Sequence, residues 1–103
     1  MRLYHCTTDT GHSEFLFTTD EQRAIQLFAT YVVLSEGEPT GLSIREVTLV
    51  TELPERRQHL AEALAHRIEA FASYELGSGW EKVLVQTRFD QLSNAAGEGA
   101  GVR

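Results

Sequence analysis

Hydrophobic and polar residues alternate at the start of the chain and then change to a helical spacing. Polar turn residues separate two short alternating segments, 2–6 and 14–17, and each is predicted to be a strand. From Thr18 onward apolar residues recur every three or four positions, which predicts a helix that ends before Gly37. Thr18 is the candidate N-cap, because Glu21 follows three residues later as in a capping box.

The second half of the sequence predicts one further helix between two strands. Residues 42–50 are rich in β-branched side chains and are expected to form a strand. A helix is predicted over 54–76, with Gly77 as its stop, followed by a strand over 80–89. The apolar run at 83–85 suggests that this last strand is central in the sheet. The apolar stripe of the predicted helix consists of Leu60, Leu64, Ile68 and Phe71.

These elements predict an α+β fold, a small mixed β-sheet sandwich with two main helices. A chain of 103 residues is the size of one domain, and residues 1–92 are expected to form it. Residues 93–103 are dominated by small residues and are predicted to be a flexible tail.

Charge and composition narrow the classes of partner. Fifteen acidic against nine basic residues give a net charge of −6, which disfavours direct binding of a nucleic-acid backbone. An acidic chain of this kind either acts on a basic protein, such as a nucleic-acid-binding protein, or is simply kept soluble by its charge. No apolar run is long enough for a membrane span and no secretory signal precedes the first strand, so a cytoplasmic location is expected.

Four residues near the first two strands are candidates for ligand binding. The His5 imidazole and Thr7 hydroxyl could hydrogen-bond a ribose or a carboxamide, although His5 could equally satisfy a backbone carbonyl within the sheet. Thr18 could contact a ligand or act only as a helix cap. Phe17, like Phe15, could stack on an aromatic ring or pack in the core.

Glu81 is the candidate catalytic group. It opens the last predicted strand, where its carboxylate could stabilise an oxocarbenium-like transition state, or could simply be solvated. By contrast, His59 and His66 lie seven residues apart without the spacing of a metal site, so they are interpreted as part of a solvated helix face and no metal is expected.

Three segments together resemble the ADP-ribosyltransferase fold. The strand Tyr4-His5-Cys6-Thr7 ends in a His-x-Thr pattern, the strand 14–17 is followed by Thr18-Thr19, and Glu81-Lys82-Val83-Leu84-Val85 is similar to the acidic strand of these enzymes. The segment Phe89-Asp90-Gln91-Leu92 also resembles their Asp-x-x-Gln-Ile or Asp-Gln-Ile ending. Within this fold, the chain resembles the phage anti-CRISPR ADP-ribosyltransferases. The chain departs from the family pattern at Gly79, which stands where a second acidic residue precedes the catalytic one by two positions.

The resemblance implies an NAD-dependent mono-ADP-ribosyltransferase that modifies a protein. His5, Thr7, Phe17 and Thr18 would bind NAD, and Glu81 would be the catalytic acid. His5 and Glu81 are then expected to converge on one cleft. The alternative is a non-catalytic module whose acidic face docks onto a basic, nucleic-acid-binding protein. That acidic face would consist of Glu36, Glu38, Glu52, Glu55 and Glu62.

Overall fold

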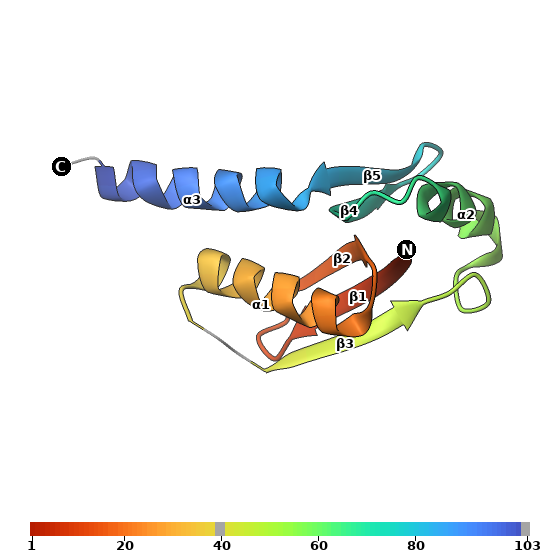
Figure 1. The fold of residues 1–103 in the computed structure, drawn as a ribbon, viewed down its shortest axis with the longest axis horizontal. Helices are drawn as coiled ribbons and strands as arrows, with labels where there is room; N and C mark the ends of the chain where they lie inside the picture. The colour runs from red at the N-terminus through yellow and green to blue at the C-terminus, as the bar shows by residue number, and fades with distance from the viewer. Residues whose placement is uncertain (39–40, 102–103) are drawn as a thin grey trace.

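The computed structural model describes residues 1–38 and 41–101, with side chains as far as Ser93. Its centre is a five-stranded sheet in the order β3-β1-β2-β4-β5, and all four pairs of neighbouring strands are antiparallel. Three α-helices and a short 3-10 helix, η1, complete the described fold (Figure 1). The strands are β1 (Arg2–Thr8), β2 (Ser13–Thr18), β3 (Leu42–Val47), β4 (Ala70–Glu75) and β5 (Gly79–Leu84). The helices are α1 (Glu21–Glu36), η1 (Pro54–Arg56), α2 (Arg57–Ala65) and α3 (Val85–Gly101).

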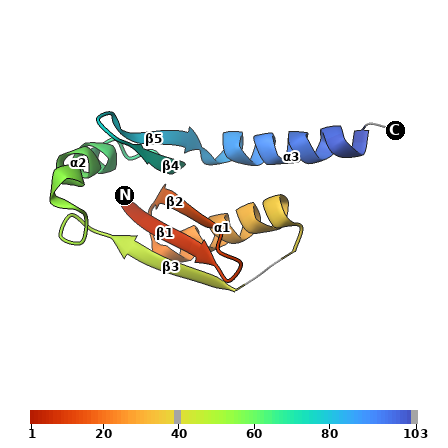
Figure 2. The same cartoon turned by 180° about the vertical axis from the view of Figure 1, so that it is seen from behind.

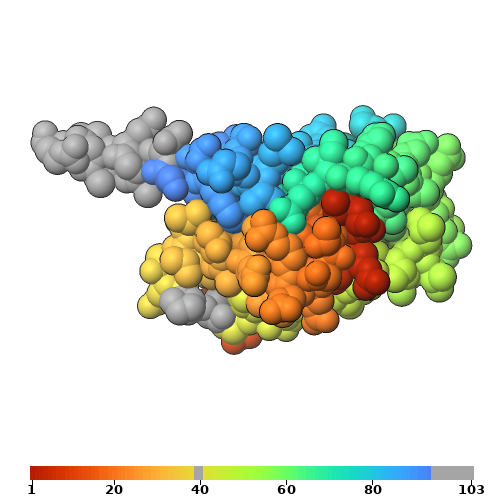
Figure 3. Space-filling view, in the orientation of Figure 1, coloured from red at the N-terminus to blue at the C-terminus, as the bar shows by residue number. Residues whose placement is uncertain are grey.

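The helices lie on both sides of the sheet. α1 and the described start of α3 contact each other and cover one face, as Figure 3 shows. α2 packs on the opposite face, near one end of the molecule (Figure 1). We call these the α1 face and the α2 face. Seen from the α2 face, β1, β2 and β3 have no helix in front of them over much of their length (Figure 2).

Alternation along the strands divides the buried side chains into two cores. In β1, Tyr4 and Cys6 pack on the α1 face, whereas Leu3 packs on the α2 face. The first core contains Phe28 and Phe71, and the second is centred on Leu60 of α2. The sheet is thus a single layer between helices, with apolar side chains on both of its faces.

The first half of the sequence folds close to expectation. Both predicted strands and the following helix are confirmed, and Gly37 ends the helix with a φ of 85°. The N-cap prediction is wrong: Asp20, not Thr18, caps α1 by accepting a hydrogen bond from the Arg23 amide. Thr18 instead ends β2 and is fully buried.

The helix predicted over 54–76 is wrong in its second half. α2 ends at Ala65, and Arg67 adopts a left-handed φ of 52°, which stops the helix. The following segment becomes β4, paired with both β2 and β5. Of the expected stripe, Leu60 is buried on α2, Ile68 is 42% exposed, and Phe71 is buried on a strand rather than a helix. Pairing on both edges of β4 outweighs the helical spacing of its sequence.

The last predicted strand and the sheet type also need correction. β5 ends at Leu84, and α3 begins at Val85, so the apolar run spans a strand end and a helix start. β5 lies at an edge of the sheet, not at its centre. The sheet is antiparallel rather than mixed, and three α-helices form instead of two. The α3 backbone continues into the segment 93–103, predicted as a tail. The side chains from 94 onward, and residues 102–103 as a whole, lie outside the described part. The domain boundary at 92 stays a prediction.

Candidate functional site

A pocket of about 220 Å³ lies between α2 and the β4–β5 hairpin. α2 contributes His59, Glu62 and Ala63, and β5 contributes Gly79, Trp80 and Lys82. Most of the residues that line it carry nitrogen or oxygen atoms able to bind a polar ligand. These residues are His59, Glu62, His66, Ser78, Trp80 and Lys82.

Gly79 allows α2 to approach the hairpin. Its φ of 97° lies in the region that favours glycine, and a Cβ at this position would stand 3.2 Å from Cγ of His59. His59 is held from the other side as well, because its Nδ1 lies 2.9 Å from the hydroxyl of Tyr74. Arg56 stacks over the Tyr74 ring at 4.2 Å. The pocket wall formed by α2 is therefore anchored to β4.

Trp80 lines the pocket and is the only tryptophan of the chain. Its ring makes edge contacts with Phe15, Phe17 and Tyr74. Its indole Nε1–H is buried and has no hydrogen-bond partner among the described residues. Buried donors are almost always paired in folded proteins, so this group has an unmet need for an acceptor.

Lys82 provides the positive charge of the pocket. Its ammonium donates a 2.7 Å hydrogen bond to the carbonyl oxygen of Ala63, in the last turn of α2, and lies 4.6 Å from the centre of the Phe17 ring. Burial lowers the pKa of Lys82. An ammonium has three N–H donors, and the Ala63 carbonyl uses one of them.

The strand residues on the α2 face of the sheet carry charge of one sign only. Register places Arg45, His5, Phe15, Ala72 and Lys82 side by side in one row across the α2 face. Among the described strand residues, this face carries Arg45 and Lys82 and no carboxylate. The strand carboxylates alternate to the α1 face; they are Glu14, Glu46, Glu75 and Glu81. The α2 face is thus locally basic in an acidic protein.

Three of the four predicted cofactor-binding residues lie on the α2 face. His5 and Thr7 are half-buried on β1, and Phe17 is fully buried in the second core, where it cannot stack on a ligand. Thr18 lies on the α1 face, and its hydroxyl donates a 2.6 Å hydrogen bond to Glu69. The structure therefore does not bring the four residues together around one ligand.

Glu81, the predicted catalytic acid, is exposed on the α1 face of β5. His5 lies on the opposite face of β1, and β2 and β4 separate the two strands. Three intervals between strands amount to about 14 Å. The expectation that His5 and Glu81 converge on one cleft is therefore wrong.

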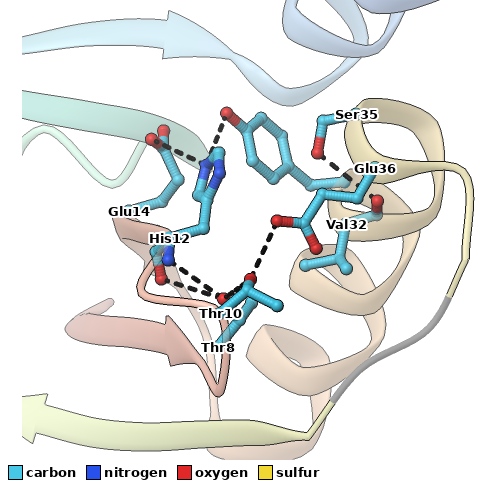
Figure 4. A network of polar contacts seen from close by, with 8 residues as sticks. Thr8, Thr10, His12, Glu14, Val32, Ser35 and Glu36 are labelled. Carbon is cyan, nitrogen blue, oxygen red and sulfur yellow. Dashed lines mark hydrogen bonds and ion pairs between the residues drawn. The ribbon is translucent and has the colours of Figure 1, made fainter.

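A second polar cluster joins the β1–β2 hairpin to α1 (Figure 4). Thr10 donates to Glu36 at 3.0 Å, and Nε2 of His12 lies 3.1 Å from the hydroxyl of Tyr31 and 3.6 Å from Glu14. Because the phenol and the carboxylate face the same ring nitrogen, they cannot form a carboxylate–imidazole–hydroxyl relay. This cluster fastens the hairpin to the helix.

Sequence reasoning missed the pocket, although it noticed part of its pattern. The spacing of His59 and His66 places them on one side of α2 and its C-cap, and both line the pocket, His59 half-buried and His66 exposed. Trp80 and Lys82 are two residues apart on β5 and therefore point to the same face, a pattern that indicates a shared site. What the sequence does not reveal is that α2 packs against β5.

No family model, curated protein or solved structure matches this chain. Within the described residues, no group of three or more acidic, histidine or cysteine side chains could hold a metal ion. No described helix combines the length and apolarity that a membrane crossing requires. The ADP-ribosyltransferase resemblance stays a prediction.

Proposed function

We propose that this protein is a non-catalytic binding module whose pocket between α2 and β5 takes the anionic group of a small ligand, a phosphate or a carboxylate. The observation that carries the proposal is Lys82, which lines a pocket of polar side chains and whose ammonium gives only one of its three N–H donors to the Ala63 carbonyl. A negatively charged acceptor atom would bind the remaining N–H donors of this ammonium. The two imidazoles and the Ser78 hydroxyl add further donors.

The size of the pocket supports a small group. Pockets for drug-sized ligands have volumes of roughly 300–1,000 Å³, so a volume of about 220 Å³ suits a phosphate or carboxylate with a short substituent better than a complete dinucleotide. Glu62 is the one acidic residue that lines the pocket, and its charge would oppose an anion. Removing the Glu62 charge should therefore strengthen the binding of an anion and weaken the binding of a cation.

The alternative acidic docking face receives less support from the arrangement of its residues. Glu36 and Glu38 lie at the C-terminal end of α1, whereas the other three belong to the region of η1 and α2. These two regions lie at opposite ends of the molecule (Figure 1). The five carboxylates would therefore not contact a partner through one surface.

Fluorescence of the only tryptophan tests the proposal directly. Inorganic phosphate, citrate and NAD are titrated separately at constant ionic strength, and phosphate or citrate is expected to change the Trp80 emission in a saturable way. Glu62→Gln should tighten binding by about two- to fivefold, because it removes a like charge from the pocket wall. Glu55→Gln removes the same charge from the exposed η1 and is the matched control.

Two results would overturn the proposal. One is the absence of a saturable response to either anion. The other is binding of NAD that is lost in His5→Ala or Thr7→Ala but unaffected by Lys82→Gln, which would favour the cofactor site implied by the resemblance.

A further inference from the structure

Part of the α2 face lies beyond the reach of α2, on β1, β2 and β3 (Figure 2). The side chains there are short hydroxyls around one aromatic pair and one arginine. They are His5, Thr7, Ser13, Phe15, Ser43 and Arg45, and we call them the open patch. All six are half-buried or exposed.

The aromatic pair of the open patch is pre-arranged. The rings of His5 and Phe15, on neighbouring strands, stack with their centres 4.6 Å apart and their planes at 19°. The Phe15 ring then meets Trp80 at 5.2 Å. Since the strands and core packing hold these rings, a further flat ring added to them would cost little ordering entropy.

The charge of Arg45 lies beside the rings of the open patch. Nη2 of Arg45 lies 3.5 Å from Nδ1 of His5, and the guanidinium is exposed. Burial and the neighbouring Arg45 charge lower the pKa of His5, which favours the neutral ring at neutral pH. The described strand carboxylates all lie on the other face, so the overall charge of −6 does not describe this patch.

We propose that the open patch binds single-stranded nucleic acid, with a base stacked on the His5–Phe15 pair and a backbone phosphate on Arg45. Flat aromatic surfaces beside cationic side chains bind single strands with little sequence preference, because every base has a π-face. The strands β3, β1 and β2 span about 10 Å, enough for two or three nucleotides. The patch offers hydroxyls rather than large exposed apolar side chains, which argues against a protein partner. None of its six residues lines the pocket, although Phe15 contacts Trp80, and the proposal does not depend on the proposed function.

Fluorescence anisotropy with a labelled twelve-nucleotide oligothymidine tests this proposal at low salt. Arg45→Gln should weaken binding and reduce the dependence of log affinity on log salt by about 0.7, the contribution of one phosphate contact in a single strand. Arg2→Gln is the matched control, because Arg2 is also exposed and basic but lies on the α1 face of β1 beside Glu46. It should bind as the unaltered chain does.

Phe15→Ala should weaken binding about tenfold through the lost stacking. Circular dichroism checks that this variant folds. If it does not, the Arg45→Gln variant, changed at an exposed residue, still tests whether the open patch binds the oligonucleotide. Absence of salt-dependent binding overturns the proposal, as does an equal loss in Arg45→Gln and Arg2→Gln. An equal affinity for duplex DNA of the same length would also overturn it, because stacking needs unpaired bases.

Discussion

Lys82 and Ala63 are joined by a 2.7 Å hydrogen bond between the lysine ammonium and the alanine carbonyl oxygen. The carbonyl belongs to the last turn of α2, where no further helical residue can satisfy it. Lys82 therefore attaches the end of a nine-residue helix to the edge strand β5. This contact fixes the C-terminal end of the helix beside the pocket.

Lys82→Met should lower the free energy of unfolding by about 1–2 kcal/mol, since it removes a charged hydrogen bond while keeping the aliphatic stem. Urea denaturation followed by circular dichroism measures the loss. Arg45→Met is the control, because Arg45 is exposed and has no carbonyl partner among the described contacts; its change should stay within about 0.5 kcal/mol. Equal losses would contradict the anchoring role of Lys82.

Glu69 should make the fold sensitive to acid. Burial alone would raise the pKa of Glu69, but hydrogen bonds from Arg23 and Thr18 and the Arg23 charge outweigh it, and the pKa is lowered from 4.5. Because the folded pKa is the lower one, this stabilisation is complete above the unfolded value and is lost as pH falls through the folded value. Urea melts from pH 7 to pH 3 should show a shallower acid loss in Glu69→Gln. The exposed Glu81→Gln should retain the original slope.

Leu60 should contribute more to stability than Leu64, although both belong to the same helical stripe. Leu60 is fully buried among Leu3, Phe17 and Val47, whereas Leu64 is partly exposed. Leu60→Ala should cost about 2–5 kcal/mol through cavity formation, and Leu64→Ala clearly less. Chemical denaturation of the two variants compares them. A larger loss for Leu64→Ala would contradict the observed seat of α2 on the sheet.

The hairpin glycines separate backbone strain from side-chain contact. Gly77 and Gly79 have similar φ values, 86° and 97°, but only at Gly79 would a Cβ meet another side chain, that of His59. Gly77→Ala should cost about 1–2 kcal/mol from the left-handed backbone. Gly79→Ala should cost more and should also change the Trp80 emission, because α2 must shift. Equal costs would show that the contact with His59 is unimportant.

The first half of the fold follows from local sequence, and the second half does not. β1, β2 and α1 have clear spacing and turn residues, so alternation and helical periodicity identify them. β4 carries apolar residues at helical spacing, and only its pairing with β2 and β5 makes it a strand. The pairing with β2 joins residues more than 50 positions apart, such as Phe15 and Ala72, beyond any local pattern, whereas β4 and β5 form a hairpin.

The candidate site shows the same limit. Alternation on β5 places Trp80 and Lys82 on one face, and spacing places His59 and His66 on one side of α2. Nothing local reveals that these two surfaces meet. The same limit explains why the sequence did not reveal that His5 and Glu81 are far apart. The face on which each side chain lies depends on where its strand begins, and the distance between them depends on the strand order.

Because Cys6 is buried, the reaction rate of the single thiol of the chain measures how often the fold opens. Cys6 is fully buried between α1 and the sheet, and burial, with the Glu14 charge, raises its pKa to about 12. Thiol reagents attack the thiolate, so the folded protein should resist alkylation at neutral pH. The labelling rate then reports how often β1 separates from α1, without an engineered cysteine.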